Sequence, residues 1–346
     1  MRETIKQLQE RWTPELTMRT LEDAEPRSPF GRLPSDLWDF RGFGDFDWRE
    51  RLRSQGLADH LIVDYLKRSC IESMNGMRFV ECDFSRANFA RVSFASCTFE
   101  RCEFVGTVFQ RASITSCSFR DCKFHNASFK YAYLGFPDQD KRGKTVFDQC
   151  LLERCQFAGT SFGAPTFVNV VFSHCKGSFR FMASSFENVS FVGHYKTLEF
   201  CNGWQSKEEE KEYGVVPPNP MRNVSFADAE IDSFDCNCQC PLSHVVLPKT
   251  GRFFLLRGFW NCLLEIRTAA QNEDSVIKNE LLVYCRTHFC EEGRRSPRSR
   301  FETQDEYIES LDSLARHFQP RTISVLSEVF RKYQVSAEEL SNPATP

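Results

Sequence analysis

The feature that most constrains the fold is an apolar residue that returns at every fifth position between Phe79 and Leu134. Ten of these twelve residues are phenylalanine, in a chain with 34 phenylalanines among 346 residues. The residue two positions earlier is small or carries a thiol in all but the first case, and the residues between are mostly polar. A period of five is neither the 3.6 of a helix nor the 2 of a strand. It predicts a chain that turns a corner every five residues and directs two side chains of each unit inward.

Individual units show the whole pattern, as in residues 82–86 (Cys-Asp-Phe-Ser-Arg) and 87–91 (Ala-Asn-Phe-Ala-Arg). The tract resembles the pentapeptide-repeat family, whose units run small residue, polar residue, Leu or Phe, and then two polar residues. The resemblance covers residues 76–192 and 223–235. It implies a right-handed, four-sided β-helix in which four pentapeptides make one coil.

We therefore predict a mainly β fold, a right-handed quadrilateral β-helix with a helical N-terminal cap and an α-helical C-terminal domain. The N-terminal capping region spans residues 1–75 and is partly helical, with an apolar stripe between Leu57 and Leu66. The β-helix spans residues 76–240 and has loops near 135–145 and 193–221, where turn-forming and charged residues interrupt the repeat. The helical C-terminal domain spans residues 252–346. Its predicted stripes are Leu263, Leu264, Ile266, Val276, Ile277, Leu281, Leu282 and Tyr284; Tyr307, Ile308, Leu311, Leu314 and Phe318; and Ile323, Leu326, Val329, Phe330 and Tyr333.

With four units to a coil, residues twenty apart stack on one face, about 4.8 Å from each other. The interior ladder then contains Phe84, Phe104 and Phe124, with Cys82, Cys102 and Cys122 in the neighbouring small-residue position. A buried cysteine behaves as a small apolar residue. A metal cluster is the alternative for these thiols, but their spacing differs from that of zinc sites and no histidine accompanies them.

A second group of cysteines lies at the end of the repeat tract. Cys236, Cys238 and Cys240 are followed by His244, a set that carries metal-ligating atoms. The C-x-C spacing is not that of a structural zinc site, and Cys236 is in phase with the apolar residues of the last coil. We expect no metal here, and the metal-binding interpretation stays open at this stage.

The outward positions supply a candidate interaction surface. Residues two after the central Phe point outward, which gives a stripe of Arg91, Arg111 and Tyr131, with Lys130 beside it. This stripe either meets an anionic partner or is simply solvated. Acidic residues gather elsewhere, in the second loop. The candidate surface is Arg91, Arg111, Lys130, Tyr131, Glu208, Glu209 and Glu210.

Several classes of function are not favoured. The sequence has none of the common hydrolase, metalloprotease, nucleotide-binding or dinucleotide-binding motifs, so we predict no enzyme, no catalytic residue and no cofactor. A net charge of −3 and a pI near 6.2 argue against wholesale binding of nucleic acid. No apolar stretch approaches the length of a membrane span, and the N-terminus lacks a secretory signal. We expect a cytoplasmic protein whose sixteen cysteines are reduced.

The sequence therefore predicts a non-enzymatic scaffold that binds an unidentified protein partner. The first alternative is protection of DNA gyrase, which some pentapeptide-repeat proteins achieve by imitating DNA with an acidic face. Residues 76–134 do not have that charge, since they hold eight Lys and Arg against five Asp and Glu. The second alternative is nucleic-acid binding through the basic stripe and the basic linker at 294–300. The resemblance also implies that the C-terminal helices can form a homodimer.

Overall fold

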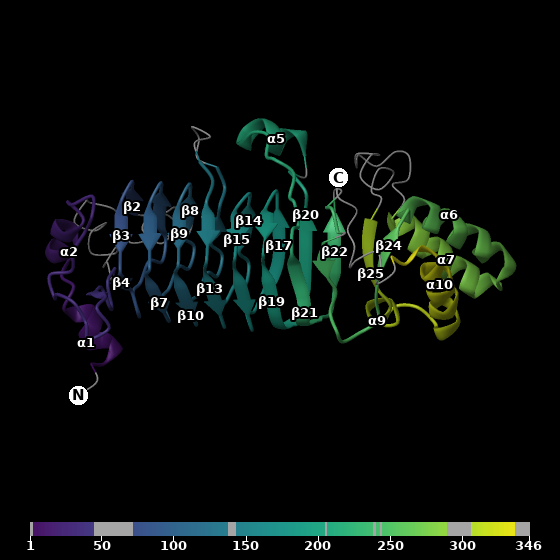
Figure 1. Ribbon diagram of the computed structural model, residues 1–346, viewed down its shortest axis with the longest axis horizontal. Coiled ribbons are helices and arrows are strands. Elements are labelled where there is room, and N and C mark those ends of the chain that lie inside the picture. Colours follow the sequence, from purple (N-terminus) through teal and green to yellow (C-terminus); the bar gives the residue numbers. More distant parts are fainter. Residues whose placement is uncertain are drawn as a thin grey trace, which may run out of the picture. The chain divides into compact units, whose positions relative to one another are not determined.

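The computed structural model describes residues 3–44, 72–137, 143–204, 206–237, 240–242, 244–288 and 306–335. These residues fall into two compact units, which are described separately. The first unit is 1–179 together with 207–215, and the second is 180–206 together with 216–346. Short parallel strands stacked coil upon coil dominate the first unit (Figure 1).

In the described part of the first unit, each coil has four faces, of which three are parallel sheets and one is a row of single bridges. The first sheet contains, in spatial order, β1 (Trp38–Asp39), β4 (Cys82–Asp83), β7 (Glu103–Val105), β10 (Lys123–His125), β13 (Leu151–Glu153) and β16 (Val171–Ser173). The second contains β2 (Glu72–Asn75), β5 (Val92–Ala95), β8 (Ser113–Thr115), β11 (Tyr133–Leu134) and β14 (Ser161–Gly163). The third contains β3 (Arg78–Val80), β6 (Thr98–Glu100), β9 (Ser118–Arg120), β12 (Val146–Asp148) and β15 (Thr166–Val168). On the fourth face, single parallel β-bridges link one residue of each coil to one residue of the next, in the order Asn88, Val108, Ser128, Gln156 and Lys176.

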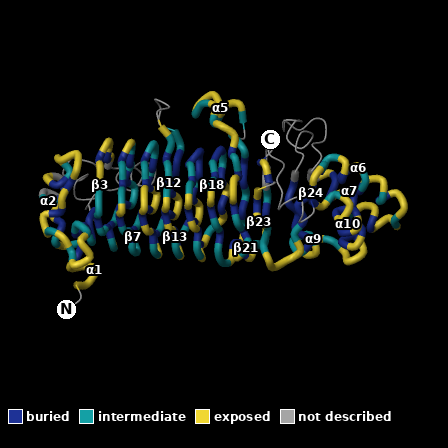
Figure 2. The backbone as a smooth tube through the Cα atoms, in the orientation of Figure 1, coloured by how far each residue is buried: buried dark blue, intermediate teal, exposed yellow. Residues whose placement is uncertain are grey.

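The predicted interior ladder is confirmed. Phe104 and Phe124 are opposite each other in paired strands, and their ring centroids are 4.6 Å apart with nearly parallel planes. Phe84 stacks on Phe104 at 5.3 Å, and all three rings are fully buried. Figure 2 shows buried positions recurring along the coils. The distance between rings matches the distance between strands, so aromatic stacking and strand pairing act along the same axis.

The cysteines of the small-residue position are core residues, as predicted. Cys82, Cys102 and Cys122 are fully buried and form no disulfide. The Sγ of Cys102 donates to the carbonyl oxygen of Phe79 at 3.5 Å, and that of Cys122 donates to Phe99 at 3.4 Å. Burial raises the pKa of the Cys102 and Cys122 thiols well above the ordinary value. These thiols therefore remain protonated and serve as packing groups.

The first predicted loop leaves the coil register intact. Phe119 lies opposite Phe147 and Phe124 lies opposite Leu152, pairs that are 28 residues apart instead of twenty. The extra eight residues therefore leave the coil between β11 and β12 and return to the same ladder. Residues 138–142, in the middle of this insertion, are outside the described part of the chain.

The prediction of a second loop over residues 193–221 is wrong for the first half of that range. Residues of this segment form strands β19 (Ser190–Tyr195) and β20 (Thr197–Cys201), and Leu198 and Phe200 are fully buried. Phe200 stacks on Phe181 at 5.3 Å. Alternation with period two replaces the period of five here, so the five-residue pattern does not predict these strands. A helix, α5 (Lys207–Tyr213), follows in place of an irregular loop.

The remaining strands belong wholly or partly to the second unit. They are β17 (Ser178–Met182), which contains the boundary between units, β18 (Ser185–Glu187), β21 (Val224–Ile231), β22 (Phe234–Asn237) and β23 (Val245–Val246). β21 lies between β19 and β23 in one sheet, and β20 pairs with β22 in another. Phe226 stacks on Phe191 at 5.0 Å, so the aromatic interior is also present in this unit.

Residues 3–44 cap the first coil. They include α1 (Ile5–Glu10) and α2 (Pro14–Thr20), and β1 pairs with β4. Phe40 and Phe43 are fully buried and contact the ring of Phe84 at 5.1 and 6.3 Å. The cap thus covers an end that would otherwise expose an open sheet edge and aromatic interior. The helical stripe predicted from Leu57 to Leu66 is outside the described residues.

An ion-pair cluster holds the cap together. The carboxylate of Asp39 accepts from Arg11 at 2.5 and 2.9 Å and from Arg41 at 2.8 Å. Burial alone would raise the pKa of Asp39, but the hydrogen bonds from Arg41 and Arg11 hold it well below its usual range. This carboxylate is therefore charged and paired at neutral pH.

The C-terminal part of the second unit combines helices with a two-stranded antiparallel sheet. Its elements are β24 (Phe253–Arg257), α6 (Phe259–Ala269), the 3-10 helix η1 (Ala270–Asn272), α7 (Ser275–His288), β25 (Glu306–Ser310), α9 (Leu311–Leu314) and α10 (Pro320–Tyr333). The predicted stripe from Leu263 to Tyr284 lies in α6 and α7, and the one from Ile323 to Tyr333 lies in α10, so both are helical as predicted. The helix predicted over 307–318 is wrong at its start, because Tyr307 and Ile308 lie in β25 and pair with Leu256 and Leu255 of β24. Cross-strand pairing overrides local helical spacing there.

We expect Phe104→Ala to lower the free energy of unfolding by about 3–5 kcal/mol, because it removes a ring from the middle of a stacked ladder. The outward Lys123→Ala on the next strand should change it by less than about 0.5 kcal/mol. Denaturant titration followed by far-UV circular dichroism measures both. Equal effects of the two variants would contradict the ladder as the main source of stability.

Candidate functional site

Two exposed tyrosines and two half-buried aromatic rings lie on one part of the first unit. Tyr131 and Tyr133 are 53% and 55% exposed, while most other rings of the β-helix are buried. The ring of Tyr133 is 6.2 Å from that of Phe136, which in turn is 5.4 Å from Tyr213 of α5. We refer to Tyr131, Tyr133, Phe136 and Tyr213 as the aromatic surface. Exposed aromatic groups in a cluster are typical of interaction sites.

Two glycines in the following coil make room for these rings. A Cβ atom at Gly159 would lie 2.5 Å from the Tyr131 ring, and one at Gly163 would lie 2.6 Å from the Phe136 ring. Tyr131 and Phe136 thus lie directly against the backbone of the next coil. Opposite Tyr133 in the paired strands are the small residues Ser113 and Ser161. The tyrosine ring therefore stands above its neighbours.

Three of the four predicted residues of the basic stripe follow one corner of the coils. Arg91, Arg111 and Tyr131 have φ values of 64°, 58° and 58°, the left-handed conformation that turns the chain at each corner. The guanidinium of Arg111 lies 5.7 Å from the centre of the Tyr131 ring, and Lys130 is exposed beside it. A cation over a tyrosine face is an attractive contact. The structure therefore places Arg111, Lys130 and Tyr131 together.

The acidic residues Glu208, Glu209 and Glu210 form the first turn of α5. Glu208 and Glu210 are exposed, and the contact between Tyr213 and Phe136 attaches this helix to the aromatic surface. Burial and the neighbouring Glu212 raise the pKa of Tyr213. The site therefore combines aromatic rings with basic residues next to Tyr131 and acidic residues on α5.

Sequence reasoning missed Tyr133, Phe136 and Tyr213. Tyr133 precedes the central Leu134 of its unit, a position that points outward in every pentapeptide, so a search for aromatic residues there would have found it. The approach of Tyr213 to Phe136 joins residues that are distant in sequence. No local pattern predicts that contact.

The described residues contain no group of three or more His, Cys, Asp or Glu side chains placed to hold a metal ion. In the set of Cys236, Cys238, Cys240 and His244, Cys240 is buried, and its Sγ is 3.9 Å from the carbonyl oxygen of Phe200. His244 is exposed. Cys238 and the side chain of Cys236 are outside the description, so the metal-binding interpretation of that set stays a hypothesis.

A buried acid in the C-terminal helical part is the other unusual group. Glu309 of β25 accepts a hydrogen bond from the hydroxyl of Tyr284 at 2.8 Å, and both side chains are buried. Burial raises the pKa of Glu309 to about 7, even though the bonds from Tyr284 and the Ser310 N–H favour the charged form. Because Glu309 is enclosed, it is a structural group, and keeping its carboxylate charged in the interior costs free energy of folding at neutral pH.

The chain's comparison with known proteins agrees with this architecture. The faces and the five-residue register define the class as a quadrilateral β-helix. Residues 73–135 match the family described as pentapeptide repeat region, so the chain contains a pentapeptide-repeat β-helix. No curated protein matches the sequence.

Several solved structures are similar in fold. A trypsin-treated variant of QnrB1, a plasmid-mediated fluoroquinolone resistance protein, is 17% identical over 46% of this chain and 79% of its own, with a TM-score of 0.27. A pentapeptide repeat protein from the Arabidopsis thaliana thylakoid lumen is 16% identical over 43% and 75%, with a TM-score of 0.20. HetL from the cyanobacterium Nostoc, involved in heterocyst differentiation regulation, is 10% identical over 59% and 93%, with a TM-score of 0.18. These likenesses concern the fold alone.

Among the described residues, no helix has both the length and the apolar character needed to span a membrane.

The raised pKa of Glu309 predicts a pH-dependent stability of the C-terminal helical part. Between its unfolded pKa, about 4.3, and about 7, the folded carboxyl keeps a proton that the unfolded one has lost. Unfolding then releases a proton, so the free energy of unfolding falls as pH rises through this window. Glu309→Gln should remove that fall, and the exposed Glu328→Gln on α10 should keep it.

Urea titration of the far-UV helical signal at pH 5 and pH 8 measures this difference. If the free energy of unfolding falls by the same amount between pH 5 and pH 8 in the wild type and in Glu309→Gln, the pH dependence does not come from Glu309.

Proposed function

We propose that this protein is a non-enzymatic interaction scaffold whose aromatic surface contacts a protein partner. The observation that carries the proposal is the pair of exposed tyrosines, Tyr131 and Tyr133, set on a stacked β-helix. Tyrosine and arginine are the residues that most often dominate binding energy at protein interfaces. Because the rings lie on a backbone paired on both sides, little conformational entropy is lost when a partner binds.

The charges beside the aromatic surface specify the kind of partner. Arg111 and Lys130 lie beside Tyr131, and Glu208 and Glu210 belong to α5, which contacts Phe136 through Tyr213. A complementary surface would place apolar or aromatic side chains on the two tyrosines, carboxylates opposite Arg111 and Lys130, and a basic group opposite α5. Charges at the rim fix orientation more than they add affinity.

The surface favours this function over imitation of DNA. Several outward carboxylates are paired with cations of the neighbouring coil, including Glu103 with Lys123 at 3.5 Å and Glu81 with Arg101 at 3.2 Å. Coil-to-coil compensation of this kind reduces the uncompensated acidic field that a DNA mimic requires. Gyrase protection is the alternative, and a supercoiling assay with and without quinolone tests it. The nucleic-acid alternative also involves the 294–300 linker, which is outside the described residues.

Homodimerisation through the C-terminal helices stays a prediction. Leu264 of α6 and Val276 and Val283 of α7 are exposed apolar residues that a second copy could cover. Sedimentation analysis of the whole chain measures the oligomeric state.

The double variant Tyr131→Ala with Tyr133→Ala should weaken partner binding at least about tenfold, because it removes two anchoring rings. Leu151→Ala with Val171→Ala is a matched control, since these residues are also exposed and apolar but lie on another face, in β13 and β16. Affinity capture from the cells of origin, followed by titration of the purified partner, measures the effect. Equal affinity of the two double variants would contradict the proposed surface.

A further inference from the structure

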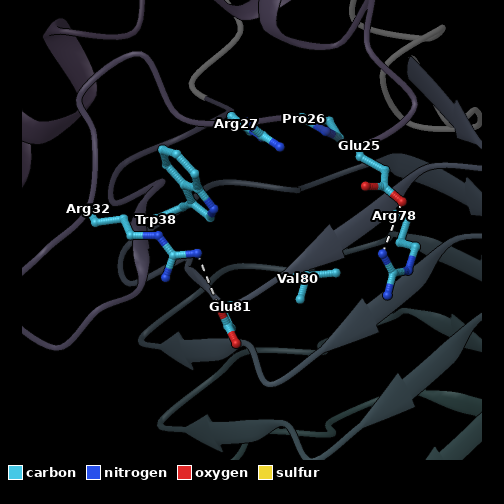
Figure 3. A pocket seen from close by; sticks show the side chains of 8 residues that line it. All are labelled: Glu25, Pro26, Arg27, Arg32, Trp38, Arg78, Val80 and Glu81. Atoms are coloured by element: carbon cyan, nitrogen blue, oxygen red, sulfur yellow. Dashed lines mark hydrogen bonds and ion pairs between the residues drawn. The ribbon is translucent and has the colours of Figure 1, made fainter.

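A pocket lies where the N-terminal cap meets the first coil (Figure 3). Its volume is about 210 Å³. Trp38 and Arg27 line the pocket from the cap, and Val80 and Glu81 line it from the coil. The complete lining is Glu25, Pro26, Arg27, Arg32, Trp38, Arg78, Val80 and Glu81. Trp38 is half-buried and so presents part of its ring to the pocket.

Backbone pairing holds both sides of the pocket in place. The N–H of Trp38 donates to the carbonyl oxygen of Glu81 at 2.6 Å, and the N–H of Arg78 donates to that of Ala24 at 2.7 Å. The cap segment before Trp38 is therefore attached to the first coil on both sides of the cavity. A ligand bound here would contact both.

The arginines around this pocket follow a rule. Arg78 bridges Glu25 at 2.9 Å and Glu100 at 3.1 Å. Arg32 bridges Glu81 and Asp36, each at 3.1 Å. Arg101, on the adjoining coil, bridges Glu81 and Glu100. Each of these three guanidiniums is thus shared between two carboxylates.

Arg27 breaks this rule. Within the described part of the chain, no carboxylate pairs with Arg27, whose guanidinium carbon lies 5.9 Å from the centre of the Trp38 ring; Arg32 lies over the same ring at 4.9 Å. Of the three arginines in the lining, Arg32 and Arg78 are each paired with two carboxylates. Arg27 is therefore the arginine of the lining that remains available to a ligand.

We propose that this pocket binds a carboxylate group carried on a flat or apolar ligand, with the carboxylate on Arg27 and the body of the ligand against Trp38. A guanidinium is suited to a carboxylate because it donates two parallel hydrogen bonds. Glu25 and Glu81 in the lining disfavour a phosphate dianion, which they would repel more strongly than a monoanion. The proposal is independent of the aromatic surface.

Two sources can supply such a carboxylate, a free aryl carboxylic acid or an acidic side chain of a peptide. Benzoate represents the first, and a capped peptide with one glutamate beside a tyrosine represents the second. Benzamide and phenyl phosphate are the matched controls, one without charge and one with more. Isothermal titration with the whole chain gives the affinity of each probe.

We expect benzoate or the peptide to bind with a dissociation constant below about 10 mM, and benzamide and phenyl phosphate to bind at least about tenfold more weakly. The probe that binds more tightly identifies the source. Because a ligand stabilises the state that binds it, protection of residues 25–40 from hydrogen exchange should rise with benzoate or peptide concentration.

Arg27→Gln should reduce the affinity at least about tenfold, since it removes a charge-assisted hydrogen bond from an exposed side chain that packs against Trp38. Arg27→Lys keeps the charge without the planar fork and should give an intermediate affinity. Arg19→Gln, an exposed arginine of α2 outside the lining, is the control and should bind as the wild type. Unchanged circular dichroism excludes misfolding of the variants.

Three results would overturn the proposal. The first is failure of both benzoate and the peptide to bind the wild type at about 10 mM. The second is equal affinity of Arg27→Gln and Arg19→Gln. The third is tighter binding of phenyl phosphate than of benzoate, which would make the site a phosphate site.

Discussion

The stacking of aromatic rings at the spacing of paired strands is the interaction on which the first unit depends. Phe104 and Phe124 are 4.6 Å apart, and the parallel strands that carry them are joined by backbone hydrogen bonds over the same interval. Ring stacking and backbone pairing can therefore both adopt their preferred spacing. The insertion before β12 shows how firmly this match holds the register, since Phe147 returns to the ring of Phe119 at 4.7 Å after eight extra residues.

In this arrangement the inward side chains stabilise the fold, and the outward side chains are available for contacts. Inward positions accept rings, small residues and thiols that are too deeply buried to ionise, such as Cys102. Outward positions carry mostly polar or charged side chains, and at the corners φ is left-handed. The exposed tyrosines Tyr131 and Tyr133 are at outward positions.

The sequence was sufficient for the parts that follow from one repeated distance. It predicted the ladder of Phe84, Phe104 and Phe124, the burial of Cys82, and the proximity of Arg111 to Tyr131. What it could not predict depends on contacts outside the repeat. Strand β20 has period two, and β25 is a strand because β24 pairs with it. The contact of Tyr213 with Phe136 and the Trp38 pocket each join distant segments, for which a single sequence has no local signal.

The central claim is that one coil advances the chain by one strand spacing, and a distance measurement tests it directly. Asp83 and Val171 lie in strands separated by four pairings of one sheet, through Glu103, Lys123 and Leu151. Spin labels at Asp83 and Val171, introduced as non-native amino acids, should give a narrow distance distribution near 19 Å, or about four strand spacings, apart from the label linkers. Moving the second label to Leu151 should shorten it by about 5 Å. A broad distribution, or no shortening, would contradict the account.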